Sequence, residues 1–252
     1  MNRLKSNRAQ AWALCGLICL LLFIAQSAVA QDVAINFGDG ESLTTRSVQL
    51  LLLVTVLSLV PGIAIMVTCF PFMVTVLAIL RQAIGLQQSP PNMLMISLAL
   101  FLTYFVMEPV FTESWQLGIA PMIAGDVDIE GGIAAALPPL RGFMEARISP
   151  DTLAELLALR PEISPSIPFS EAPLSVVIPS FLLSEMERAF QIGFLIFLPF
   201  LVIDLVVAAV LMSMGMMMVP PAIVALPFKL AFFVVADGWS LIAASLVRGY
   251  TG

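Results

Sequence analysis

The stretch Asp204–Asp237 decides the fold of this chain; it reads DLVVAAVLMSMGMMMVPPAIVALPFKLAFFVVAD. Two apolar arms flank a turn that holds a glycine, a Pro-Pro pair and a cluster of methionines. This pattern predicts two membrane helices joined in a hairpin. Asp204 and Lys229 each interrupt one arm, 13 and 12 residues from Met217 near the centre of the turn. At about 1.5 Å per residue, the two opposite charges lie roughly 18 to 20 Å from the turn, at matching depth.

These two charges are candidate functional residues, because an unpaired charge in hydrocarbon is costly. Asp204 and Lys229 can form an intramembrane ion pair that fixes the register of the two arms. Two other roles stay open: a part in gating or assembly, and a charge relay in an ion-driven transporter that would also use Asp237. Pairing is the usual solution for an intramembrane charge, which favours the first role.

The composition is that of a polytopic membrane protein. Hydrophobic residues make up 60% of the 252 positions, charged residues 11%, and the mean hydropathy is +1.03. A soluble domain has about 45–50% apolar and about 25% charged residues.

Residues 1–30 have the pattern of a cleaved signal peptide, although an uncleaved first membrane helix is the alternative. Three basic residues precede an apolar run and a small-x-small site: Arg3, Lys5, Arg8 and Ala28-Val29-Ala30. Cleavage after Ala30 removes these three positive charges and lowers the formal net charge from −6 to −9. A chain with this much negative charge is not expected to bind nucleic acid, which is itself negatively charged. Cys69 is then the one cysteine left, which excludes an intramolecular disulfide.

Four apolar segments after this point approach or exceed the roughly 20 residues that span a membrane. They are Val48–Phe70, Met93–Val110, Phe190–Met214 and Ala222–Leu246. We expect kinks at Pro61-Gly62, Pro199 and Pro227. Between the first two segments we expect a connection that ends in a Pro-Pro loop, Gln87–Asn92.

The predicted organisation is an all-α membrane protein with a small helical insert outside the membrane. Its parts are a polar N-terminal segment (31–47), a first membrane hairpin (48–110), the insert (111–179) and a second hairpin with the Met-rich turn (180–252). Within the insert we expect one helix over Leu140–Arg147 and another that starts after Ser149 and ends before Pro161. A cleaved signal and four spans predict a periplasmic insert in a bacterium.

An enzyme is not expected. The chain has no histidine, which excludes Ser-His-Asp triads and His-ligated metal sites, and it has no Gly-rich phosphate loop. Asp204 and Asp237 lack the flanking residues of a membrane aspartyl protease. The sequence therefore predicts neither a catalytic residue nor a metal or other cofactor.

The methionine cluster has two interpretations. Five methionines lie within Met212–Met218, and unbranched thioethers can simply fill gaps in a core. At a turn bounded by glycine and proline they can instead form a compliant hydrophobic constriction, with Met214, Met216, Met217 and Met218 as pore or gasket residues. The chemistry alone leaves both open.

Several motifs together resemble the FliP family of flagellar export-gate proteins and their relatives in type III secretion injectisomes. They are Leu80–Gly85 with Gln87–Asn92, Leu98–Thr103, Pro139–Arg141 with Phe143-Met144, Pro179–Phe181 through Glu185 to Ala189–Phe194, Gly215–Pro221, Leu226–Leu230, and Asp237-Gly238-Trp239. The resemblance covers nearly all of Val48–Leu246. It weakens over Ile119–Ala136, which is rich in Gly and Ala, and over Glu145–Thr152.

The resemblance implies a helical oligomeric gate, a pentamer of this chain with FliQ- and FliR-like subunits and other export-apparatus proteins. The gate would sit at the flagellar basal body in the bacterial inner membrane, in contact with lipid, and pass unfolded flagellar substrates. It further implies that Met216–Met218 form a gasket and that Glu185 acts in assembly. Phe143, on the helix expected over Leu140–Arg147, is expected to face a partner and is therefore a second candidate assembly residue.

Overall fold

The computed structural model describes residues 43–86, 90–163, 167–216 and 218–251, and within these ranges the chain is helical with connecting turns and no strand. The expected signal peptide, most of the polar segment that follows it, and Met217 lie outside the described residues. The chain divides into two units, Met1–Val54 and Thr55–Gly252. Helix α2 (Leu43–Met66) crosses this division and continues through Pro61.

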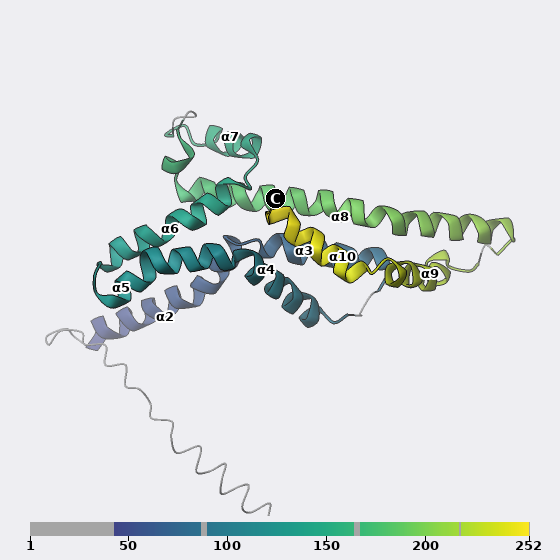
Figure 1. Cartoon of the computed structure of the whole chain (residues 1–252), viewed down its shortest axis with the longest axis horizontal. Helices are drawn as coiled ribbons and strands as arrows, with labels where there is room; N and C mark the ends of the chain where they lie inside the picture. The colour runs from purple at the N-terminus through teal and green to yellow at the C-terminus, as the bar shows by residue number, and fades with distance from the viewer. Residues whose placement is uncertain (1–42, 87–89, 164–166, 217, 252) are drawn as a thin grey trace, which may run out of the picture. The chain divides into compact units, whose positions relative to one another are not determined.

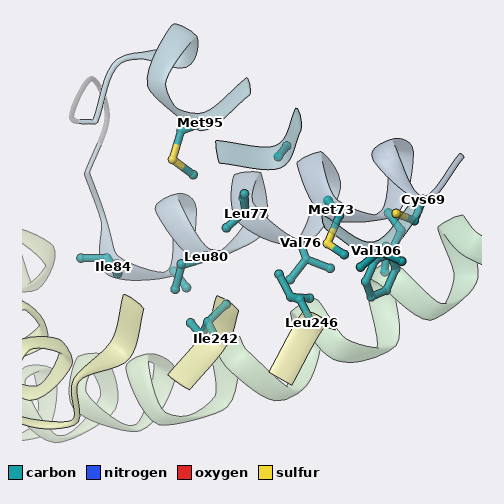
Figure 2. Close-up of a cluster of buried hydrophobic side chains, with 14 of the residues drawn as sticks. Cys69, Met73, Val76, Leu77, Leu80, Ile84, Met95, Val106, Ile242 and Leu246 are labelled. Atoms are coloured by element: carbon teal, nitrogen blue, oxygen red, sulfur yellow. The ribbon is translucent and has the colours of Figure 1, made fainter. Parts of the chain in front are cut away.

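Helix α3 (Phe70–Ile84) forms the centre of the core, although most of it lies where the sequence predicts only a connection between two membrane segments. Its buried side chains run along its whole length: Phe72, Met73, Val76, Leu77, Leu80, Ala83 and Ile84. Figure 2 shows residues of α4 and α10 gathered around this helix. With 15 residues, about 22 Å, α3 is too short to cross a hydrocarbon core of about 30 Å, so it buries its apolar surface against other helices.

Helix α4 (Asn92–Ser114) continues through a π-helical turn, η1 (Trp115–Ile119), into α5 (Ala120–Ala124). Together they form a continuous apolar helical segment of 33 residues, Asn92–Ala124. The expected start of the insert, at residue 111, lies inside this segment. Helix α6 (Ile129–Glu145) then returns along α4 and η1, and it starts 11 residues before the expected helix at Leu140. Close packing of α6 against η1 explains the earlier start of α6. Gly132 and Ala136 of α6 lie so near Gly118 of η1 that they fill the space a Cβ on Gly118 would occupy.

Helix α7 (Pro150–Ala158) lies within the predicted bounds, with Ser149 at its N-cap position. The Ser149 side chain makes no capping bond; instead its backbone N–H donates to Ser184 Oγ at 2.9 Å. After the short 3-10 helix η2 (Phe169–Glu171), the chain enters α8.

Helix α8 (Leu174–Ser213) is one helix of 40 residues, about 60 Å long, that passes through Pro179 and Pro199. Figure 1 shows it as an unbroken ribbon, and α3 packs against it. Its first half carries Glu185, Glu187 and Arg188, whereas the only charged residue of the second half is Asp204. Both boundaries of the predicted insert therefore fall inside continuous helices.

Helices α9 (Pro221–Val235) and α10 (Gly238–Thr251) form a bent pair with an angle of 62° at the break between them. The bend lies at Asp237, which has a φ of +48°, and not at Pro227, where the kink was expected. The ring of Phe233 fills the space beside Gly238, so a side chain there would overlap it. Among the described residues three helices are long and apolar enough to cross a membrane, or up to four if the bent pair counts as one.

Candidate functional site

The Met-rich turn is a defined structure between two helix ends. Helix α8 ends in a Schellman motif, in which the Gly215 N–H donates to Met212 O and the Met216 N–H donates to Leu211 O, both at 3.0 Å. Gly215 has a φ of +75°, a conformation that glycine adopts at no steric cost. Pro221 then occupies the first turn of α9, where its fixed φ suits a helix start.

The methionines of this turn face outward. The exposed fractions are 67% for Met214, 42% for Met216 and 97% for Met218. Met214 and Met216 also border an apolar groove of about 560 Å³ between α8 and α9. These methionines are therefore not gap-fillers within the core of a single protomer.

Asp204 and Lys229 form an ion pair across the two arms of the hairpin. The distance from Lys229 Nζ to Asp204 Oδ2 is 2.6 Å. Nζ also donates to the carbonyl oxygen of Ala83 at 3.0 Å, near the end of α3. The pair thus joins α8, α9 and α3 at one point.

The two partners of this pair differ in exposure. The Lys229 side chain is 7% exposed and that of Asp204 is 38% exposed. Asp204 Oδ1 is buried and accepts no hydrogen bond within the described part of the chain. Asp237, the third member of the suggested relay, is exposed, lies eight residues beyond Lys229, and has no ion pair among the described residues.

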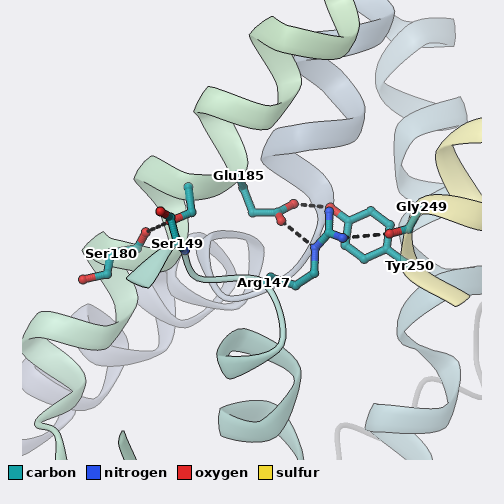
Figure 3. Close-up of polar contacts among 7 residues, drawn as sticks. Arg147, Ser149, Ser180, Glu185, Gly249 and Tyr250 are labelled. Atoms are coloured by element: carbon teal, nitrogen blue, oxygen red, sulfur yellow. Dashed lines mark hydrogen bonds and ion pairs between the residues drawn. The ribbon is translucent and has the colours of Figure 1, made fainter. Parts of the chain in front are cut away.

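Glu185 belongs to a second buried polar cluster, shown in Figure 3. Glu185 Oε1 accepts from Arg147 Nε at 2.9 Å, and Oε2 accepts from the hydroxyl of Tyr250. Arg147 Nη1 donates to the carbonyl oxygen of Gly249 at 2.7 Å, and the guanidinium carbon lies 3.9 Å from the centre of the Tyr250 ring. Arg147 Nη2 is buried with no hydrogen-bond partner in the described ranges.

Phe143 lies next to this cluster. Its ring stacks on Tyr250, with 5.9 Å between centroids and 12° between planes, and it meets Phe181 edge-on at 5.8 Å. Tyr250 therefore contacts both residues that are expected to act in assembly, Phe143 and Glu185. Neither Arg147 nor Tyr250 is predicted from the sequence, because Arg147 stands in one of the two weakly matching stretches and Tyr250 follows the last motif.

Both polar sites are built around an ion pair within the same protomer. No group of three or more metal-ligating side chains lies together among the described residues. The ion pairs join charges that neutralise each other, and the groove beside the methionines is apolar. The arrangement suits contact with an apolar or variable partner.

Comparison with known proteins identifies relatives over most of the chain. The FliP family matches residues 53–246. A flagellar biosynthetic protein FliP of Caulobacter vibrioides is 54% identical over 225 residues, which are 89% of this chain and 84% of the relative. Proteins of the same name are 43% identical in Bacillus subtilis (84% of this chain, 96% of the relative) and 42% identical in Aquifex aeolicus (92% and 98%).

Proposed function

The chain belongs to the FliP family, and from this premise we propose that it lines the protein-conducting gate of the flagellar export apparatus. Membership makes the protein a component of that apparatus. In the proposal, several copies surround a channel, and the Met-rich turn of each copy contributes to a hydrophobic constriction. The constriction excludes water and ions at rest and yields to an unfolded chain.

The observation that carries this proposal is that the methionines described in the turn are exposed, while the two helices on either side of the turn are joined by polar bonds. Met218 is 97% exposed, yet the arms behind it are joined by the ion pair between the buried Lys229 and Asp204, and Lys229 also bonds to the carbonyl of Ala83. A rigid support with a flexible apolar tip can seal around objects of different shape, because thioether side chains repack easily.

The proposed setting follows from the same premise. The gate would contain about five copies of this chain with FliQ- and FliR-like subunits, and would sit in the inner membrane at the flagellar basal body. A cleaved signal peptide would place the helical insert on the periplasmic side. The groove between α8 and α9 is entirely apolar, which suits either lipid or a neighbouring subunit.

Replacement of Met216, Met217 and Met218 by alanine tests the gasket. We expect assembled complexes to form as in the wild type, because the side chains of Met216 and Met218 bury little surface within the protomer. The closed pore should then conduct ions, since alanine leaves a wider and less apolar constriction. Ion conductance of purified complexes in planar bilayers measures this.

Met93→Ala is the matched control, since Met93 is 79% exposed at the first turn of α4, far along the chain from the Met-rich turn. It should leave the conductance at the wild-type level. Unchanged conductance in the assembled triple variant would exclude the gasket.

A further inference from the structure

We propose that Arg147, Glu185 and Tyr250 form an intramolecular latch that holds the last turn of α10 against α8, and that a protomer must close this latch before it assembles. The inference rests on the proposed function, because it concerns assembly of the same gate. It assigns roles to Arg147 and Tyr250 as positioning residues. It also changes how Glu185 acts.

The burial of Glu185 rules out direct contact between its side chain and another copy in this conformation. Its exposed fraction is 0%. Both carboxylate oxygens are already occupied, one by Arg147 Nε and the other by the Tyr250 hydroxyl. Glu185 can therefore influence assembly only through the parts of its own protomer that it holds in place.

The part that it holds is the end of α10. Arg147 comes from the turn between α6 and α7. It contacts the end of α10 twice: Nη1 donates to Gly249 O, and the guanidinium lies over the face of the Tyr250 ring. The ring is also held edge-on by Phe72 of α3, at 5.5 Å between centroids. Three segments distant in sequence thus converge on the last turn of one helix.

The latch holds α10 and not α9, because it attaches to α8 far from the point where α9 is attached. The Asp204–Lys229 pair fastens α9 to α8, and Glu185 lies 19 residues before Asp204, about 28 Å along the same helix. Between the two attachment points the chain bends by 62°. If the latch opens, α9 stays fastened, whereas α10 keeps only apolar contacts such as those of Ile242 and Leu246. A displaced α10 would present a different surface to a neighbouring copy.

Two conservative substitutions test the latch with little loss of packing. Tyr250→Phe keeps the ring contacts with Phe72, Phe143 and Arg147 and removes only the hydroxyl bonded to Glu185. Glu185→Gln keeps the shape of the side chain and removes its charge. Tyr104→Phe and Glu187→Gln are the matched controls, because Tyr104 is 61% exposed and Glu187 is exposed on the same helix as Glu185.

The measurements are backbone hydrogen exchange by mass spectrometry on the purified full chain and the fraction of oligomer on native gels. Loss of a hydrogen bond to a charged group predicts about ten- to hundredfold faster exchange in α10 for both latch variants. Exchange in α3 should stay at the wild-type rate, and the oligomer fraction should fall. The double variant should lose less than the sum of the two single variants, because both substitutions act on the hydrogen bond between Tyr250 and Glu185.

Equal acceleration in α3 and α10 would overturn the latch, since it would show a general loss of stability. Faster exchange in α10 with a normal oligomer fraction, or unchanged exchange, would overturn it as well. These outcomes do not touch the proposed gate, which the conductance of the methionine variants tests separately.

Discussion

Lys229 and Asp204 differ in burial, and this difference sets how much stability is lost when each is replaced. Lys229 is buried between α3, α8 and α9, whereas Asp204 keeps 38% of its side chain exposed. Removing the aspartate leaves an uncompensated buried ammonium. Removing the lysine leaves a carboxylate that is only partly buried within the protomer. Asp204 is therefore the more critical member of the pair.

Single and double substitutions at these residues should give unequal losses of stability. Asp204→Leu should lower the free energy of unfolding by about 3–5 kcal/mol, the usual cost of leaving a buried charge unpaired. Lys229→Met should cost less. The double variant Asp204→Leu/Lys229→Met should come close to the wild type, because apolar pairs often replace buried ion pairs without loss. Thermal unfolding in detergent measures all three.

The same double variant separates a structural pair from a relay. If the pair only fixes register, motility of a strain carrying the double variant should be retained. Normal assembly with no export would contradict this and favour the relay. A charge-swapped pair is less informative, because a carboxylate at position 229 would face the Ala83 carbonyl that now accepts from Nζ.

At the scale of elements, the Gly- and Ala-rich stretch of the insert makes a close helix contact. The backbone of Gly132 approaches Gly118 so closely that a Cβ on Gly118 would overlap it. Backbone cannot move aside as the tip of a side chain can. The contact between η1 and α6 therefore depends on glycine at position 118.

Alanine substitutions at two helical glycines should have opposite effects. Gly118→Ala should destabilise the chain by about 1–3 kcal/mol, as expected for an overpacked contact. Gly142→Ala should stabilise it by about 0.5–1 kcal/mol, because no atom lies within 4 Å of the added Cβ and alanine favours a helix. The unfolding temperature should fall for Gly118→Ala and rise for Gly142→Ala. Equal changes of unfolding temperature in the two variants would contradict the close contact at Gly118.

At the scale of the whole molecule, the proposed orientation can be tested with single cysteines. Cys69 is fully buried, so the native thiol should not react in the folded protein. Asp151→Cys in α7 should react with a membrane-impermeant maleimide added to spheroplasts. Met93→Cys, before the expected outward span, should react only after the membrane is opened. The reverse pattern would place the insert in the cytoplasm.

Much of this architecture could be predicted from local patterns. Apolar segments of spanning length indicated the membrane class, and the matching distances of Asp204 and Lys229 from the turn indicated their pairing. Helix α7 was found from its proline and acidic first turn. The extent of α6 was missed, because prolines at 138 and 139 and the glycines before them look like breaks. In the structure, close helix packing outweighs these weak helix formers.

The sequence by itself determined that this protein is an all-α membrane protein with a charged hairpin and a methionine-rich turn, and that it resembles the FliP family. These features rest on composition, periodicity and short motifs, which act locally along the chain. Only the tertiary structure decided that α3 is buried, that the last span bends at Asp237, and that Arg147, Glu185 and Tyr250 meet. The contacts of that cluster join residues 38, 65 and 102 positions apart. No local pattern records such pairings, because they arise from how whole helices pack.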